Sequence, residues 1–413
     1  MLKNKEPWQQ NLIVLWFGTF MAGMAFSEIM PFLSLYVDTL GHFSKSQLTF
    51  LSGITFSATF VVTAIVSPLW GKLADRKGRK LMLLRASLGM AIVLGAMGLV
   101  SNVWQLIALR LLQGVFSGYI SNANALIASE TPKTQAGKAM GTIVTGSTAG
   151  GLLGPLLGGT LAGIFSYRMT FFITAGILFL VFFLSWFFVK ETFKPSAAQM
   201  AHAQTSKQVW GQIKYPHLIW GLFITTMIIQ AGNNSITPIL SLYVRELLNG
   251  HGSVTFMAGI VAAVPGVATI IAAPRFGRLG DRIGTDRMIT FGFIFAIIVY
   301  IATAFTTNIW QLIALRFLVG ISDATMVPAV QTMLTKYTPR SATSRIFSYN
   351  QSFQAMGNIM GPQIGSVVSH FFNYTGVFVS TAVLVGMNFT LFRFNSKPVR
   401  KEREAREAAE HAA

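Results

Sequence analysis

The feature that most constrains this chain is a series of long apolar stretches, each about the length of one bilayer crossing. A helix needs about 20 apolar residues to span a hydrocarbon core of roughly 30 Å. A membrane β-barrel would instead show alternating segments of about ten residues. We therefore predict an all-α membrane protein with twelve transmembrane helices. The twelve stretches cover residues 11–37, 48–70, 81–101, 104–128, 138–160, 169–189, 217–243, 254–275, 288–306, 309–333, 346–368 and 373–393.

The positive charge of the chain is informative because of where it lies. The chain has 32 Lys+Arg against 14 Asp+Glu, yet only 11% of its residues are charged and 52% are hydrophobic. This apolar composition argues against a nucleic-acid-binding protein. If the N-terminus is cytoplasmic, all but five of the 32 basic residues fall in cytoplasmic segments or at cytoplasmic helix ends. The positive-inside rule then predicts that both termini are cytoplasmic.

The two halves of the chain repeat each other. NVWQLIALR at 102–110 recurs as NIWQLIALR at 308–316, and PFLSLYV at 31–37 recurs as PILSLYV at 238–244. Parallel six-helix repeats are one plan of membrane transporters, with the binding site near the bilayer midplane between them. The predicted division is a six-helix bundle at 1–189, a cytoplasmic linker at 190–216, a second six-helix bundle at 217–393 and a charged cytoplasmic tail at 394–413.

The loop GKLADRKGRK at 71–80 carries a candidate conformational gate. Gly71 and Gly78 would permit a tight turn. A carboxylate such as Asp75 can be held by basic partners such as Arg76 and Arg79, or by a helix N-terminus. The alternative is that the basic residues only anchor the topology.

The fifth stretch carries a second candidate gate. Gly150, Gly154 and Gly158 recur every four residues on one helix face, which lets another helix approach closely. Pro155 removes a backbone donor and would bend the helix. A generic packing seam of small residues is the alternative interpretation.

These motifs together resemble the major facilitator superfamily. The loop at 71–80 and its second copy GRLGDRIGTDR at 277–287 are similar to the signature loop of that family. The resemblance extends to the twelve-helix drug:proton antiporter subfamily, near the Gram-positive quinolone exporters. It implies that the loop stabilises an outward-facing state and that the fifth-helix seam seals the external side. The family's fourth-helix and fifth-helix motifs are matched by Leu106, Arg110, Gln113 and Gly114, and by Gly141, Gly150, Gly154, Pro155, Gly158 and Gly159.

Two acids fall well inside predicted spans, Glu28 and Asp323. Because a charge in the bilayer core is costly, an ionisable residue there indicates function. Glu28 is the main candidate for the proton carrier, since burial favours the protonated form of a carboxyl group. A hydrogen-bonded Glu28 without a transport role is the alternative. The resemblance places both acids at the wall of a central cavity.

Three further ionisable residues belong to this hypothesis. Asp38, near the outer mouth, is another candidate for taking up protons. The resemblance assigns Arg110 a part in a proton relay, whereas a structural Arg110 would hold backbone carbonyls or a carboxylate. Arg316 and Asp323 lie seven residues apart on one helix face, roughly 10 Å along the axis, so a direct ion pair is not expected.

The predicted substrate cavity combines an apolar face with amide and hydroxyl side chains. Aromatic rings there could stack on drugs. The polar members could equally hydrogen-bond between helices. The candidates are Met21, Met24, Phe32, Tyr36, Ser117, Gln230, Asn233, Asn234, Gln354 and Asn358.

The predicted function is a proton-coupled antiporter that exports lipophilic, cationic or zwitterionic drugs, including fluoroquinolones, by alternating access. The sequence contains no P-loop, no cysteine and no visible metal cluster, so an enzyme or a cofactor-dependent pump is not expected, and the proton gradient is the energy source. The predicted setting is a monomer in the cytoplasmic (inner) membrane of a bacterium. The alternatives are an exporter of a defined small metabolite, such as a sugar or amino-acid derivative, and a non-transporting receptor or scaffold.

Overall fold

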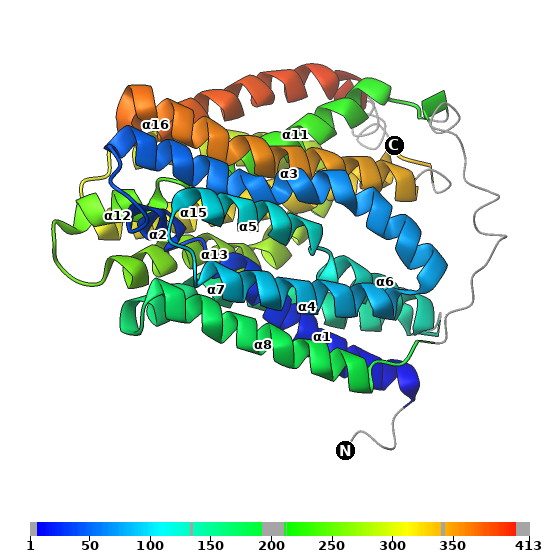
Figure 1. Cartoon of the computed structure of the whole chain (residues 1–413). Coiled ribbons are helices and arrows are strands. Elements are labelled where there is room, and N and C mark those ends of the chain that lie inside the picture. Colours follow the sequence, from blue (N-terminus) through cyan, green and yellow to red (C-terminus); the bar gives the residue numbers. More distant parts are fainter. Residues whose placement is uncertain (1–5, 133–134, 192–209, 212, 340–342, 402–413) are drawn as a thin grey trace. The chain divides into compact units, whose positions relative to one another are not determined.

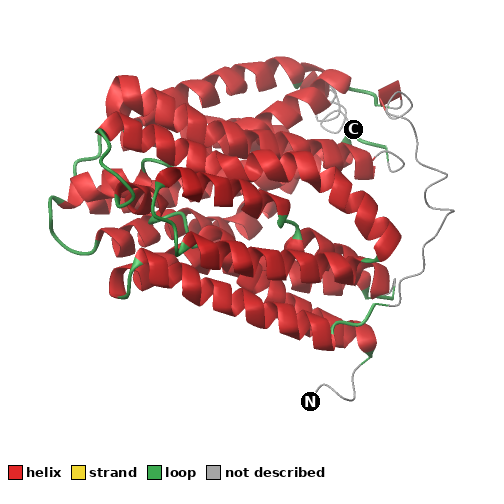
Figure 2. Ribbon diagram, in the orientation of Figure 1, coloured by secondary structure: helices red, strands yellow, loops and turns green. Residues whose placement is uncertain are grey.

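The described part of the chain is helical throughout, and no β-strand occurs in it (Figure 2). The predicted linker and the predicted charged tail lie largely outside the described residues. In this computed structural model the described residues are 6–132, 135–191, 210–211, 213–339 and 343–401.

The predicted spans correspond to the observed helices (Figure 1). Nine helical segments of the described chain are long and apolar enough to cross a membrane. One of them, α16, contains two predicted spans, which are separated where Phe372 and Asn373 leave the helical conformation. The remaining two predicted spans are α7 and the pair α11–α12. The helices are α1 (Pro7–Ser27), α2 (Leu33–Asp38), α3 (Lys45–Lys77), α4 (Arg79–Met97), α5 (Val103–Val115), α6 (Tyr119–Glu130), α7 (Ala136–Ile164), α8 (Tyr167–Phe188), α11 (Pro216–Ser235), α12 (Leu240–Leu248), α13 (Val254–Ile283), α14 (Thr285–Thr303), α15 (Ile309–Lys336) and α16 (Thr343–Asn395).

The helices form two compact units. The first comprises Met1–Ala201 and Thr237–Ala263, and the second comprises His202–Ile236 and Val264–Ala413. These units differ from the division into six and six helices, because α12 and the first turns of α13 group with the first unit. In the first unit α1 packs along α7, and α4 packs along α8 (Figure 1). In the second unit α11 packs along α16, and α14 packs along α15.

The repeated sequence produces repeated local structure. Asn102 and Asn308 both cap the following helix, and each side chain accepts a hydrogen bond from the backbone N–H three residues later. Gly78 and Gly284 both adopt positive φ, at 92° and 100°, in the turns before α4 and α14. Gly71, in contrast, lies inside α3 and makes no turn, so that part of the prediction is wrong.

Helices α1 and α11 end at nearly equivalent positions of the two sequence repeats. Pro31 follows the end of α1, and Pro238 follows the end of α11. Proline donates no backbone hydrogen bond and disfavours helical geometry in the residue before it. Each apolar stretch is therefore divided into a long helix and a short one. Glu28 lies at the C-terminal cap of α1, directly at this break.

Glycines bring α7 into backbone contact with α1, as the spacing predicts. A side chain at Gly150 would collide with the carbonyl of Phe20, and one at Gly158 would collide with the carbonyl of Glu28. Gly154 in the same way faces the carbonyl of Met24. The helix continues through Pro155 to Ile164.

The second unit contains the same row of three glycines facing backbone carbonyls, 207 residues later in the sequence. We call each row a glycine ladder. Gly357, Gly361 and Gly365 of α16 lie against backbone carbonyls of α11. The last of these carbonyls belongs to Ser235, which occupies the position of Glu28 in the repeat. The internal repeat therefore specifies a helix pair as well as a sequence pattern.

Substituting a ladder glycine should cost stability. We expect Gly154→Ala to lower the free energy of unfolding by about 1–3 kcal/mol, because the added methyl group overpacks a backbone contact. Gly151→Ala is the matched control, since a side chain there meets nothing within 4 Å. Thermal unfolding in detergent measures both variants. Equal melting temperatures for the two would contradict the ladder.

Candidate functional site

Glu28 lies inside the first unit, with its side chain 1% exposed. Its Oε1 contacts the hydroxyl of Thr174 on α8. Thr174 also lies 3.0 Å from the carbonyl oxygen of Thr170, one turn earlier in its own helix. A hydroxyl has one hydrogen to donate. Its single hydrogen therefore has two acceptors, the Glu28 carboxyl oxygen on α1 and the Thr170 carbonyl of its own helix.

The second unit repeats this hydrogen bond without the acid. Ser235, equivalent to Glu28, lies 3.0 Å from Thr381 Oγ1, and Thr381 is equivalent to Thr174. Thr381 likewise donates to a carbonyl one turn earlier, at 2.8 Å. Ser235 in turn donates to the carbonyl of Gly232 at 2.8 Å, and either hydroxyl can be the donor between Ser235 and Thr381. The two repeats therefore share a side-chain contact between the end of the first helix and a threonine, and the first unit places an acid in it.

Arg110 is buried and bonded to neighbouring groups of the first unit. Its Nε donates to the carbonyl of Thr55 at 3.1 Å, and its Nη1 donates to Gln113 Oε1 at 2.6 Å. These contacts tie α5 to α3. They match the structural alternative, in which Arg110 holds a backbone carbonyl.

The fourth predicted span is broken between α5 and α6. Arg85 donates to the carbonyls of Val115 and Ser117 at 3.0 and 2.6 Å, and its guanidinium lies 3.9 Å from the centre of the Trp70 ring. Gly118 begins the next helix with φ 105°. The second repeat has Phe at the positions of Arg85 and Trp70, and its helix α15 is continuous. Arg85 is a residue that the sequence did not single out.

The second unit brings several predicted residues together around Asp323. Asn233 Nδ2 donates to the carboxylate of Asp323 at 2.9 Å, and Tyr300 donates to Asn233 Oδ1 at 3.2 Å. The Asp323 carboxyl group is therefore a hydrogen-bond acceptor. It is partly buried and faces a small cavity whose walls include Phe293 and Tyr300.

The amides on α11 also bond between helices. Asn234 donates to Asn358 Oδ1 at 3.1 Å, and Gln230 donates to the same oxygen at 3.4 Å. These contacts link α11 with α16 next to the glycine ladder. Gln354, four residues before Asn358 in α16, is exposed.

The predicted cavity residues of the first unit are packed into its interior. Phe32 and Tyr36 are 0% and 1% exposed and pack against Tyr167 and Phe171. The hydroxyl of Tyr36 donates to the carbonyl of Met97 at 2.8 Å. The structure differs from the prediction here, because these rings contact α8 and leave no surface for a drug.

The remaining predicted cavity residues make local contacts. Met24 is 6% exposed, and Met21 packs against the core of the first unit. Ser117 donates to the carbonyl of Gly114 at 2.8 Å.

The motif loop is held by a residue that the sequence did not single out. Glu191, directly after α8, accepts from the backbone N–H groups of Arg79 and Lys80 at 2.7 and 2.9 Å. A side chain at Gly78 would collide with this carboxylate. Glu191 thus caps α4, where the positive end of the helix dipole favours a carboxylate.

The predicted contact between Asp75 and the basic residues of its loop can be described only in part. The side chain of Asp75 lies outside the described residues, and Arg76 is exposed. Arg79 Nη1 donates to the carbonyl of Ala125 at 2.7 Å.

Asp38 lies in an exposed ion pair. Its Oδ2 is 2.7 Å from Nη1 of Arg245, the residue at the equivalent position of the second repeat. Beside it, Lys45 lies 2.5 Å from Glu246. The two pairs attach the end of α12 to α2 and to the start of α3.

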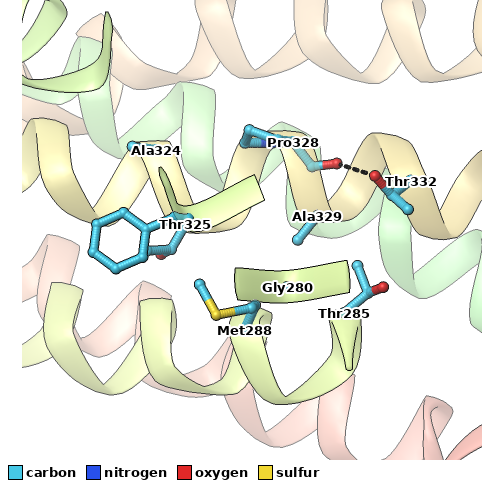
Figure 3. A pocket seen from close by; sticks show the side chains of 9 residues that line it. Gly280, Thr285, Met288, Ala324, Thr325, Pro328, Ala329 and Thr332 are labelled. Atoms are coloured by element: carbon cyan, nitrogen blue, oxygen red, sulfur yellow. Dashed lines mark hydrogen bonds between the residues drawn. The ribbon is translucent and has the colours of Figure 1, made fainter. Parts of the chain in front are cut away.

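A further cavity of the second unit lies between α13, α14 and α15 (Figure 3). Met288 and Thr285 point into it from α14, and Ala329 faces it from α15. The Thr332 hydroxyl donates to the Pro328 carbonyl at 2.9 Å, within α15 (Figure 3). The described lining carries no titratable group, so this cavity offers no candidate for proton coupling.

Comparison with known proteins identifies the family. A model of the Major Facilitator Superfamily matches residues 15–256 and again residues 222–413. The chain belongs to this superfamily of membrane transporters. It is 48% identical to the "Multidrug resistance protein MdtG" of Escherichia fergusonii over 396 residues, which are 96% of each chain. It is 47% identical to the protein of the same name from Salmonella arizonae over 390 residues, 94% of this chain and 96% of that one.

Solved structures share the fold. A bacterial homologue of the human lysosomal transporter Spinster, in an inward-facing and unoccupied conformation, matches with a TM-score of 0.79 at 16% identity. The match covers 95% of this chain and 98% of that one. The nucleoside transporter NupG matches with a TM-score of 0.74 at 12% identity, over 95% of this chain and all of its own length. The predicted twelve-helix fold and the resemblance to the superfamily are confirmed.

Removing the Glu191 cap should destabilise the first unit. We expect Glu191→Ala to lower the free energy of unfolding by about 0.5–2 kcal/mol, because two N–H groups of α4 lose their acceptor. Glu191→Gln is the graded control, since its single amide oxygen retains one acceptor. Thermal unfolding in detergent should rank wild type above Gln and Gln above Ala. An Ala variant as stable as wild type would refute the capping role.

Proposed function

We propose that this chain is a proton-coupled antiporter that exports lipophilic cationic or zwitterionic drugs by alternating access. The single observation that carries the proposal is Glu28, a carboxyl group buried at a helix break and in contact with the Thr174 hydroxyl. The relatives at 47% and 48% identity, both named multidrug resistance proteins, support drugs as the cargo. Their bacterial origin supports placement in the cytoplasmic membrane of a bacterium.

In this mechanism Glu28 carries the proton. When the region around Glu28 is open to the outside of the cell, the Glu28 carboxyl group takes up a proton. It then forms its contact with the Thr174 hydroxyl. When the site opens to the cytoplasm, water reaches Glu28 and takes up the proton. In the glycine ladder between α1 and α7, Gly158 lies directly against Glu28. This contact couples the protonation of Glu28 to movement of α7. A change in the charge of Glu28 therefore acts on the packing of α7.

The other ionisable groups have supporting parts in the proposal. Arg110 positions α5 against α3. Asp38, with Arg245, holds the end of α12 and releases it when the pair separates. The chain works as a monomer, and the proton gradient is the energy source in place of a cofactor.

Removing the acid should uncouple transport from the gradient. In proteoliposomes with an imposed pH difference, we expect Glu28→Gln to abolish gradient-driven export of a lipophilic dye, because an amide cannot release a proton. Ser235→Ala is the matched control at the equivalent position of the second unit, and we expect it to retain export. An uncoupler should abolish the wild-type signal. Undiminished gradient-driven export by Glu28→Gln would overturn the proton assignment.

The charge of the cargo should decide which part of the gradient drives export. Exchange of one proton for one monovalent cation moves no net charge, so only the pH difference contributes, at about 1.4 kcal/mol or roughly tenfold accumulation per pH unit. A zwitterionic cargo also gains about 2.3 kcal/mol per 100 mV, roughly a further 50-fold. Clamping the potential with valinomycin should therefore change the export of a zwitterion and leave that of a cation unchanged. Equal responses by the two cargos would contradict a one-for-one exchange.

A further inference from the structure

Thr174 is placed against Glu28 by a strip of side chains on α8. Tyr167, Phe171 and Thr174 recur every three or four residues and so lie on one face of this helix. Both rings pack against Phe32, four residues after Glu28 in the chain. Thr174 is fully buried, with its hydroxyl in contact with Glu28 Oε1. The position of this hydroxyl is therefore set by aromatic packing one turn away.

The other side of Glu28 is fixed by α7. A side chain at Gly158 would collide with the carbonyl of Glu28 and with its Cβ atom. Glu28 is thus held between two helices, with its backbone and Cβ against α7 and its carboxyl group against α8. A buried carboxyl group needs hydrogen-bond partners where it stands, because unpaired polar groups are costly inside a bilayer.

A proton carrier presents two different hydrogen-bonding groups in turn. A carboxylate only accepts hydrogen bonds, whereas a carboxylic acid also donates one. A group that only donates, such as a backbone N–H, suits the charged form alone. A hydroxyl both donates and accepts, so Thr174 can serve both forms of Glu28 from one position.

The carbonyl of Thr170 makes the reversal possible. This oxygen lies 3.0 Å from Thr174 Oγ1, one turn earlier in α8. When Glu28 is protonated, it donates to the Thr174 oxygen, and the hydroxyl hydrogen points to the Thr170 carbonyl. When the proton leaves, rotation about the Cβ–Oγ1 bond of Thr174 turns this hydrogen to the charged carboxylate. The hydrogen bond between the two side chains is kept in both states.

The second unit provides the same contact without an acid. Thr381, equivalent to Thr174, lies 3.0 Å from Ser235 Oγ and donates to the carbonyl of Val377 at 2.8 Å. Both threonines are buried. A purely structural role, which joins two helices, would be common to both threonines. A role in holding a proton carrier would belong to Thr174 alone, because Ser235 does not change its charge.

We propose that Thr174 is a positioning residue for the proton-carrying acid, and that it holds Glu28 in both its neutral and its charged form by reversing the direction of their hydrogen bond. This inference rests on the proposed function, in which Glu28 is the carrier, and adds a residue of α8 to the coupling machinery. Because the carboxyl group stays attached to α8, a change in its charge acts on the contact with α7.

Infrared difference spectra of the purified protein, recorded between acidic and alkaline buffer without any drug, test the contact directly. The C=O stretch of a protonated carboxyl group depends on its hydrogen bonding, and the band that disappears in Glu28→Gln belongs to Glu28. We expect Thr174→Val, which lacks the hydroxyl, to shift the frequency of this band. Thr174→Cys should shift it less, because a thiol is a weak donor and acceptor. Thr174→Ser and Thr381→Val should keep the wild-type frequency, because both retain a hydroxyl beside Glu28.

Transport provides a second readout. In proteoliposomes with an imposed pH difference, we expect Thr174→Val to slow the export of ethidium, a lipophilic cationic dye, about 10- to 100-fold, as expected for one hydrogen bond to a charged group. Thr174→Ser should restore export. Thr381→Val should retain export although it loses the equivalent hydrogen bond, and the two valine variants should melt at similar temperatures in detergent.

The two hypotheses fail in different ways. If Glu28→Gln loses no carboxyl band of the wild type, Glu28 does not change its protonation, and the proposed proton carrier is refuted. If the Glu28 band has the same frequency in wild type and Thr174→Val, the positioning role is refuted and the proton carrier stands. Equal slowing of export by Thr174→Val and Thr381→Val would likewise show that Thr174 only joins two helices.

Discussion

Backbone contact between helices, made possible by glycine, is the constraint on which the rest of this structure depends. Apolar burial gives helices little reason to associate within lipid, because lipid tails are as apolar as leucine. Close approach of backbones supplies the dispersion energy instead. The ladder of Gly150, Gly154 and Gly158 joins α7 to α1, and its repeat joins α16 to α11. Each ladder ends at one position, Glu28 in the first unit and Ser235 in the second.

The chemistry of the molecule is concentrated where the two repeats differ. The shared scaffold keeps the caps at Asn102 and Asn308, and it keeps the threonine partners of Glu28 and Ser235. Among the described residues, the first unit differs by an acid that contacts a threonine. The described part of the second unit differs by a buried arginine whose Nε has no hydrogen-bond partner and by an acid on a cavity. Duplication thus provides two helix bundles of one design, and a few substitutions give them different tasks.

Charged side chains also differ in their surroundings between the ends of helices and the membrane spans. Charges at the ends of helices, such as Asp38 and Arg245, are exposed and paired. Inside the spans, Arg110 donates hydrogen bonds to neighbouring groups, and Glu28 is buried against the Thr174 hydroxyl. In the second unit Asp323 accepts a hydrogen bond from Asn233, and Arg316 is buried on the same helix. Ionisable residues inside a membrane are costly to retain, so each of them is a candidate for a functional role.

The sequence alone determined the fold class, the twelve spans, the repeat and the glycine seam, because hydropathy and residue spacing are local properties that the bilayer translates directly into helices. It also singled out Glu28 and Asp323, since acids are rare in apolar stretches. Only the tertiary structure decided which partner each face meets. The sequence placed Phe32 among the cavity residues, yet whether its ring borders a cavity or α8 depends on residues far away in the sequence, such as Phe171. The roles of Arg85 and Glu191 were missed for the same reason, because their hydrogen-bond partners lie at least 30 residues away.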